Sequence, residues 1–336
     1  MSKSKIEWTE QTWNPIVGCS IVSPGCTNCY AMKMAGRIEA MNIDARPGHG
    51  TARQYEGTTA RINGNAVWTG KLARAPRETL RAPLKRKKPT TYFVNSMGDL
   101  FHDGCPDEWI DQVFAIMALC PQHTFQVLTK RAARMLDYCN RFKNHVTITS
   151  REGGYGLKQM AIEPGALTMG WPLPNVWLGV STERQQEADE RIPLLLRTPA
   201  ARRFISAEPL LGFIDANLWM RTIPALDWVI VGGESGPSAR PMHPGWARAL
   251  RDQCNLARVP FFFKQWGTWH PRHDDDEREG IAETCLAING AISRGDVLEG
   301  GGERPRWIAM DRVGKKRSGR LLYGREHNEM PRVAPI

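Results

Sequence analysis

Several features are missing from this 336-residue sequence, and each absence excludes a class of protein. No apolar run approaches the roughly 20 residues that a membrane-spanning helix needs, and the first residues carry no apolar segment of the secretory-signal type. We therefore expect a cytoplasmic protein without a membrane partner. The P-loop, the nucleophile elbow and the HExxH motif are also missing, which argues against a phosphate-binding β/α hydrolase that uses carboxylates and a divalent metal.

Acidic residues are scarce at both ends of the chain. Residues 1–90 hold 15 Lys/Arg against 6 Asp/Glu, and residues 301–336 hold 9 against 4, whereas the middle is mildly acidic. Clustered cations release counterions from phosphates when they bind a polyanion. This distribution favours a nucleic-acid or nucleotide partner, contacted mainly by Lys85–Lys88 and Lys315–Arg320, and a solubilising surface is the alternative interpretation.

Short β-type runs alternate with helical patterns along the chain. Strands are expected near residues 91–95, 124–128, 175–180, 203–206, 227–231 and 259–263, after a first strand at Ile16–Val17, and helices at 107–119, 184–196 and 246–257. Strands that are apolar on both faces and alternate with helices form parallel sheets covered by helices. The pattern predicts an α/β fold of about seven strands, as a partial (β/α) barrel or a doubly wound sheet.

The domain organisation follows from the spacing of these elements. We expect a β/α barrel over residues 1–268, with insertions at 40–90 and 143–174. A basic, irregular C-terminal extension, 269–336, is expected to pack on the barrel.

The expected strands end in polar residues. Because ligands bind at the carboxyl ends of parallel strands, these ends predict a substrate cavity. The residues concerned are Ser96, Gly98, Asp99, Lys130, Ser181, Glu183, Glu208, Gly232, Gly233, Glu234 and Lys264.

Three of the eight cysteines, Cys19, Cys26 and Cys29, lie together in a C-x6-C-x2-C spacing. A structural zinc site usually takes four ligands, and no second cysteine or histidine pair follows at finger spacing. Three thiolates match a [4Fe–4S] cluster with one iron left open, and an open iron can bind S-adenosylmethionine. A zinc knuckle remains the alternative.

The chain resembles the phage gene-product thirty-seven/sixty-eight family, which is related to radical-SAM enzymes. The motifs that carry the resemblance are Gly18–Ala31, Asn95–His102, Leu128–Arg131, Asn175–Ser181, Ser206–Leu210, Phe263–Gly267 and Arg312–Arg325. The resemblance implies a phage or mobile-element setting, a partial (β/α) barrel of the radical-SAM type and a cysteine-bound [4Fe–4S] cluster. The common spacing in radical-SAM enzymes is C-x3-C-x2-C, so the first gap is longer here.

The resemblance also implies roles for individual residues. Cys19, Cys26 and Cys29 match the cluster ligands. The end of the 91–95 strand matches the site of the methionine amino group, the end of the 175–180 strand matches ribose and carboxylate contacts, and the segment after 227–231 matches the adenine site. These three sites correspond to Ser96, Gly98 and Asp99, to Ser181 and Glu183, and to Gly232, Gly233 and Glu234.

Three further residues are candidates for catalysis. Lys130, with Arg131, is placed to meet the carboxylate of S-adenosylmethionine or a substrate phosphate, and Glu208 and Lys264 form either a structural ion pair or a catalytic pair. The leading hypothesis is a radical-SAM-like enzyme that modifies or repairs a bulky nucleic-acid or nucleotide substrate with the help of an unidentified electron donor. The alternative is a non-catalytic, zinc-stabilised nucleic-acid-binding protein.

Overall fold

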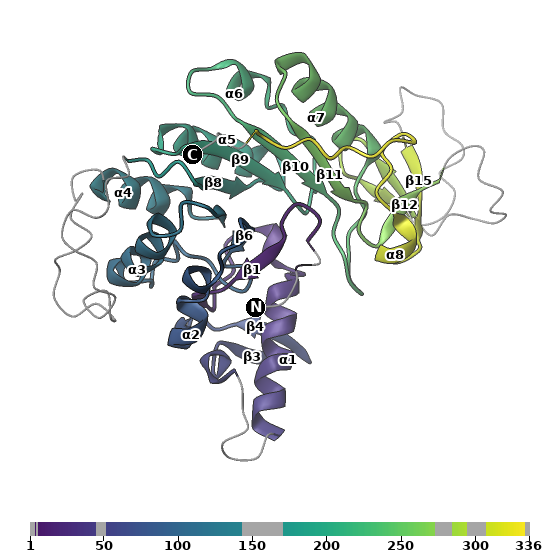
Figure 1. Ribbon diagram of the computed structural model, residues 1–336. Helices are drawn as coiled ribbons and strands as arrows, with labels where there is room; N and C mark the ends of the chain where they lie inside the picture. Colours follow the sequence, from purple (N-terminus) through teal and green to yellow (C-terminus); the bar gives the residue numbers. More distant parts are fainter. Residues whose placement is uncertain are drawn as a thin grey trace.

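A computed structural model describes residues 4, 6–44, 52–142, 171–272, 284–293 and 307–332. Its centre is a sheet of seven strands in the order β1-β6-β7-β8-β9-β10-β11, and every neighbouring pair is parallel. The sheet curls into a half-barrel (Figure 1). The strands are β1 (Gln11–Trp13), β6 (Thr91–Val94), β7 (Thr124–Thr129), β8 (Val176–Ser181), β9 (Arg202–Ala207), β10 (Trp228–Gly232) and β11 (Phe261–Gln265).

The strand order decides between the two architectures that the sequence left open. A doubly wound sheet reverses its order at a switch point, whereas here the order across the sheet follows the order along the chain. The partial (β/α) barrel is therefore confirmed. The predicted strands after the first all lie within a few residues of their expected positions.

Helices that follow the strands contribute to the main core of the molecule. On α3, Ile110, Val113, Phe114 and Met117 are buried, as the spacing of apolar residues predicted. Among the described residues no helix is long and apolar enough to cross a bilayer. The helices are α3 (Asp107–Ala118), α4 (Ala132–Phe142), α5 (Gln185–Arg197), α6 (Asn217–Arg221) and α7 (Pro244–Ala257).

The inner face of the half-barrel carries a second core made largely of aromatic rings. The rings are those of Trp8, Phe93, Trp177, Phe204, Trp228 and Phe262. A Cβ atom at Gly179 would lie 2.5 Å from the Phe204 ring, so glycine is needed where that ring crosses β8. These side chains fill part of the interior of the half-barrel, and the open space lies at the carboxyl ends of the strands.

The prediction of Ile16–Val17 as the first parallel strand is wrong. The first strand of the sheet is β1, and Ile16–Val17 (β2) pairs antiparallel with β5 (Ala73–Arg74) instead. Pro15 separates the two segments and has no N–H for a ladder hydrogen bond. Its carbonyl accepts from the Ala75 N–H at 2.9 Å, which directs the chain out of the sheet.

The segment between β2 and β6 forms a separate layer beside the half-barrel. Its helix α1 (Tyr30–Asp44) packs on a hairpin of β3 (Thr59–Ile62) and β4 (Asn65–Trp68) (Figure 1). The turn residues Asn63 and Gly64 both have positive φ, 48° and 77°, as a two-residue hairpin turn requires. The short helix η2 (Arg53–Tyr55) belongs to this layer through Tyr55. Two more short segments, α2 (Arg77–Leu80) and η3 (Pro83–Lys85), pack on the main core instead, through Leu80 and Leu84.

The C-terminal extension contains more regular structure than the sequence suggested. A four-stranded antiparallel sheet runs in the order β12-β15-β13-β14, so the expectation of an irregular segment is wrong. Its elements are β12 (Trp269–Pro271), β13 (Thr284–Ala287), β14 (Ile292–Ser293), β15 (Trp307–Arg312) and α8 (Lys315–Ser318).

The last described residues protect the free edge of β11. The Phe263 N–H donates to the His327 carbonyl at 3.0 Å, and Phe262 forms an antiparallel bridge with Asn328. An edge strand covered in this way does not template pairing with another chain. The expected insertion at 143–174 lies outside the described residues except for 171–174.

Candidate functional site

A cavity of about 490 Å³ opens at the carboxyl ends of the strands, within the usual size range of ligand sites. Twelve of the fourteen residues singled out in the sequence line it, and Glu183 and Gly232 do not. The twelve are Cys19, Cys26, Cys29, Ser96, Gly98, Asp99, Lys130, Ser181, Glu208, Gly233, Glu234 and Lys264.

The cavity combines this polar rim with an apolar wall. Ile6, Trp8, Phe93 and Leu128 line it together with the strand ends. A mostly apolar cavity with a few convergent polar groups is typical of a small-molecule site.

One side of the cavity is formed by residues 18–29, which we call the cysteine loop. It contains a short 3-10 helix, η1 (Pro24–Cys26), and ends where α1 begins. Gly18 has a φ of +95°, and a Cβ there would lie 2.1 Å from the Lys71 carbonyl oxygen. At Gly98 a Cβ would lie 2.8 Å from the Gly18 oxygen, so Gly98 allows the loop to approach the end of β6.

A first carboxylate–arginine pair holds the start of the cysteine loop. Asp99 accepts hydrogen bonds from Thr129 Oγ1 at 2.7 Å and from Arg131 Nη1 at 2.9 Å, and two backbone N–H groups also donate to it. Arg131 in turn donates to Ser20 Oγ at 2.7 Å and lies 3.7 Å from Cys19 Sγ. Four donors saturate the Asp99 carboxylate, so its contacts position Arg131 and the loop.

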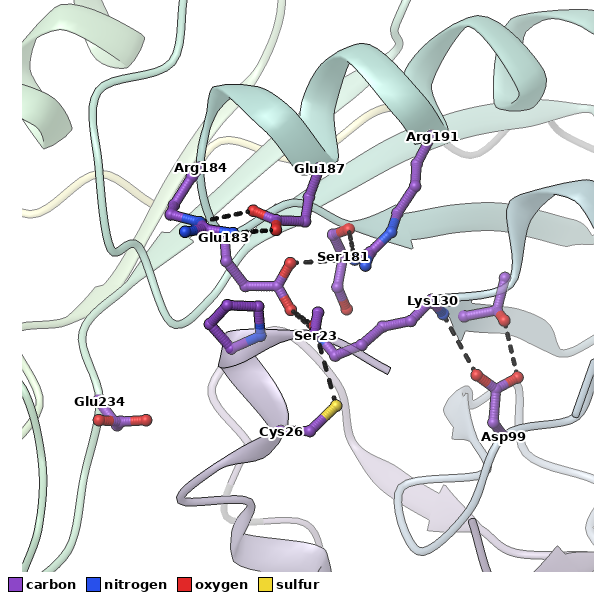
Figure 2. A network of polar contacts seen from close by, with 12 residues as sticks. Ser23, Cys26, Asp99, Lys130, Ser181, Glu183, Arg184, Glu187, Arg191 and Glu234 are labelled. Carbon is purple, nitrogen blue, oxygen red and sulfur yellow. Dashed lines mark hydrogen bonds and ion pairs between the residues drawn. The ribbon is translucent and has the colours of Figure 1, made fainter. Parts of the chain in front are cut away.

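A second carboxylate, Glu183, holds the middle of the cysteine loop. It is fully buried and accepts from Ser23 Oγ at 2.7 Å, from Arg191 Nη1 at 3.0 Å and from Lys130 Nζ. Figure 2 shows the Glu183 carboxylate beside Ser23 and Cys26 of the loop. A Cβ at Gly25 would lie 2.3 Å from Glu183 Oε1, which shows how closely the loop packs on this carboxylate.

The electrostatics of Glu183 favour its charged form. Burial by itself raises the pKa of the Glu183 carboxyl, but Lys130 and Arg191 outweigh burial and hold that pKa below its usual value. The side chain expected to contact a ribose or a carboxylate therefore belongs to a buried ion-pair network, and so does Lys130.

A third carboxylate, Glu234, holds the end of the cysteine loop. Asn28 Nδ2 donates to Glu234 Oε2 at 3.0 Å, and Arg240 Nη2 donates to Glu234 Oε1 at 2.6 Å. Arg240 also donates to the Pro24 carbonyl at 2.9 Å. Three strand-end carboxylates thus fasten one loop at three points.

Glu208 and Lys264 form the remaining charged pair of the cavity rim. The Lys264 ammonium lies 2.6 Å from Glu208 Oε1, and both side chains are only partly exposed. No hydrogen bond between this pair and the cysteine loop is found among the described residues. Gly232 lies against this pair, because a Cβ there would be 3.2 Å from Glu208 Cδ.

Two thiols of the cysteine loop, those of Cys19 and Cys29, have raised pKa values. Burial, with smaller contributions from Asp99 and Cys26, raises the pKa of the Cys19 thiol to about 12, although Arg131 opposes the shift. Burial also raises the pKa of the Cys29 thiol. In the part of the chain that the structure describes, no three His, Cys, Asp or Glu side chains are arranged to hold a metal ion.

Comparison with known proteins gives a family but no activity. A family model described as a protein of unknown function (DUF5131) matches residues 3–331. The chain belongs to the DUF5131 family. No curated protein and no solved structure matches the sequence.

Some residues that build the site in this DUF5131 protein were missed by the sequence analysis. Arg191 lies on α5 and Arg240 precedes α7, and neither belongs to a motif. Ser23 and Asn28 lie inside the cysteine motif but occupy positions between the cysteines. Arg191 and Arg240 lie only eight and six positions after the carboxylates that they contact, Glu183 and Glu234, but the sequence analysis did not pair them. Ser23 and Asn28 have no local signal, because the carboxylates that they contact are 160 and 206 positions away.

The contacts of Glu234 with Arg240 and Asn28 predict that the stability of the protein depends on pH. Burial raises the pKa of the Glu234 carboxyl, but hydrogen bonds from Arg240 and Asn28 outweigh it and hold the pKa below its usual value near 4.5. A carboxyl with a lowered folded-state pKa stabilises the fold above its unfolded pKa, and this contribution is lost as pH falls through the folded pKa. Glu234→Gln should therefore unfold more easily than the wild type at pH 7, and the difference should shrink below about pH 4.5.

Urea unfolding at pH 7 and in steps below pH 4.5 measures this effect. Glu190→Gln, at an exposed position on α5, is the control and should change stability by less than about 0.5 kcal/mol at either pH. A difference between Glu234→Gln and the wild type that is independent of pH would contradict the prediction.

Proposed function

We propose that the chain is a radical-SAM-like enzyme. In this proposal Cys19, Cys26 and Cys29 bind a [4Fe–4S] cluster, and S-adenosylmethionine occupies the adjoining cavity. The observation that carries the proposal is that three thiols from one loop line the same cavity as the strand ends of a parallel half-barrel.

The donor set suits such a cluster. Thiolates are the usual ligands of iron–sulfur clusters, and three of them leave one coordination position open. Arg131 lies 3.7 Å from Cys19 Sγ, and a cation at this position favours the thiolate form that ligation requires. When bound, the two groups would together supply one-electron radical chemistry.

The polar rim suits the amino-acid end of S-adenosylmethionine. An α-amino acid carries an ammonium and a carboxylate side by side, and Glu208 and Lys264 present the opposite charges side by side at the cavity. Glu208 would accept from the ammonium and Lys264 would donate to the carboxylate. The apolar wall with Trp8 and Phe93 would exclude water from the rest of the cavity.

The substrate class in the proposal is nucleic acid or a nucleotide, which would be modified or repaired. Its support is the basic charge of the N-terminal 90 residues, which hold 15 Lys/Arg against 6 Asp/Glu and include the cysteine loop. The resemblance to the phage family adds a phage or mobile-element setting.

Anaerobic reconstitution with iron and sulfide tests the proposal. We expect about four irons and four labile sulfides per chain, as a [4Fe–4S] cluster requires, and binding of S-adenosylmethionine to the reconstituted protein. A protein that takes up zinc without labile sulfide would instead support the zinc-stabilised nucleic-acid-binding protein.

A variant at Glu208 tests the role of the rim. In Glu208→Gln the side chain keeps its shape and one of its two oxygens, but it loses its negative charge. Losing one charged hydrogen bond costs about 1.5–3 kcal/mol, so S-adenosylmethionine should bind about 10–150-fold more weakly. Titration calorimetry on reconstituted protein measures this change.

The control for this titration is Glu108→Gln, at an exposed position on α3, which should bind S-adenosylmethionine like the wild type. Iron content should be the same in both variants. Equal affinity in Glu208→Gln and Glu108→Gln would rule out a role for Glu208 in binding this ligand.

A further inference from the structure

A second cavity, of about 550 Å³, lies outside the half-barrel. Its walls come from α1, from the β3–β4 hairpin and from Pro237 and Ser238 in the loop after β10. We call it the basic groove, because Lys33, Arg37 and Arg61 line it. The α1 helix and the hairpin that form it lie side by side in Figure 1.

The three cations of the basic groove are not paired with a carboxylate of the described residues. The ammonium of Lys33 and the guanidinium groups of Arg37 and Arg61 make no hydrogen bond or ion pair with another of the described residues. Glu39 is the one carboxylate among the described residues that line the groove. It accepts from the Gly57 N–H and from Thr59 Oγ1, both at 2.6 Å. Three unpaired cations against one carboxylate leave the groove with an excess of positive charge.

The arrangement of the cations on α1 is unfavourable without an anionic partner. Lys33 and Arg37 are four residues apart on the helix, and like charges at this spacing destabilise a helix by about 0.2–0.5 kcal/mol. An anion bound between them would remove this repulsion.

Small residues form the rest of the groove. Its lining includes Gly36, Ala40, Ala60 and Ala66, and a Cβ at Gly36 would lie 2.5 Å from Ala66 Cβ. Aromatic side chains, on which bases stack, are missing from the groove lining among the described residues. The groove therefore suits the charged backbone of a ligand better than its bases.

The basic groove lies directly beside the 490 Å³ cavity that Cys19, Cys26 and Cys29 line, which we call the cysteine cavity. Asn28, which lines the cysteine cavity, donates to the carbonyl of Ser238, which lines the groove, at 2.8 Å. Lys33 Nζ is 3.7 Å from the position that a Cβ would take at Gly236. A ligand in the groove is thus separated from the cysteine cavity by the contact between two loops.

We propose that the basic groove binds backbone phosphates of a nucleic-acid strand and directs a neighbouring nucleotide into the cysteine cavity. The proposal rests on the proposed function and narrows its substrate to a polymer. A strand spans both cavities at once, whereas a single nucleotide fills only one of them.

Salt-dependent binding of a fluorescent single-stranded oligonucleotide of about 12 nucleotides tests the groove. Each phosphate contact contributes about −0.7 to the slope of log K against log salt for a single strand. The triple variant Lys33→Gln, Arg37→Gln, Arg61→Gln should therefore bind more weakly, with a slope less negative by about 2.

The matched control is Lys85→Gln, Lys87→Gln, Lys88→Gln, which removes the same charge. These exposed residues precede β6 and so lie toward the amino ends of the strands, away from the cavity. Although the sequence predicted phosphate contacts here, this control should keep the wild-type slope. Both variants should melt within a few degrees of the wild type.

Three results would overturn the groove proposal. They are an equal loss of affinity in the two triple variants, an unchanged slope in the groove variant, and competition by a mononucleotide as strong as by the unlabelled oligonucleotide. Iron content and binding of S-adenosylmethionine are measured on the same proteins. If the wild type binds the cluster and S-adenosylmethionine but no oligonucleotide, only the groove proposal fails. If the wild type binds the oligonucleotide through the groove but takes up no cluster, only the enzyme proposal fails.

Discussion

Replacement of Cys26 by alanine is expected to reduce the iron content of the reconstituted protein from about four atoms per chain to almost none. Cys26 is buried in the middle of the cysteine loop, and Cys19 and Cys29 line the same cavity. Two thiolates do not hold a [4Fe–4S] cluster that depends on three. Iron and sulfide analysis after anaerobic reconstitution, together with the visible absorption spectrum, measures the loss.

Cys254→Ala is the matched control for the cluster. Cys254 is a fully buried thiol on α7 and belongs to the main core. Its replacement removes a sulfur atom without touching the loop, so the iron content should stay at the wild-type value. Equal iron content in Cys26→Ala and Cys254→Ala would exclude the cysteine loop as the cluster site.

Glu183→Ala is expected to cause the largest loss of stability among the strand-end variants. The Glu183 side chain is fully buried and faces Lys130 and Arg191, whose side chains are 18% and 4% exposed. Removing one partner of a buried ion pair leaves an uncompensated charge and costs about 3–5 kcal/mol. Loss of the Ser23 hydrogen bond also releases the middle of the cysteine loop.

Urea unfolding at pH 7 measures the loss of stability in Glu183→Ala. Glu190→Ala, at an exposed position on the neighbouring helix, should change the free energy of unfolding by less than about 0.5 kcal/mol. We also expect Glu183→Ala to take up less iron than the control, because the loop loses one of its three attachments. A loss of stability below about 1 kcal/mol would show that the buried network does not depend on Glu183.

The contacts of Asp99, Glu183 and Glu234 change the interpretation of the strand-end carboxylates. The sequence grouped Asp99, Glu183 and Glu234 with Glu208 as acceptors around one cavity. The structure gives each of the first three an arginine partner and connects it to the cysteine loop, Asp99 through Arg131 and the other two directly. Glu208 pairs with Lys264 instead. A buried carboxylate needs such partners because an unpaired charge in the interior is costly.

The sequence by itself determined the local features of this protein. Apolar runs located six of the seven parallel strands, because each buried strand is a continuous stretch of the chain. The spacing of Cys19, Cys26 and Cys29 identified the loop, and the polar strand ends identified the residues that line the cavity. All these features are properties of neighbouring residues.

Only the tertiary structure decided the contacts between distant residues. The winding of the sheet depends on which strands become neighbours, and periodicity does not encode that choice. The cysteine-loop partners of two carboxylates are equally remote: Ser23 contacts Glu183 across 160 positions, and Asn28 contacts Glu234 across 206. The basic groove likewise joins α1, the hairpin and the loop after β10. A side chain's charge can be read from the sequence, but its contacts with distant segments are set by the packing of the whole chain.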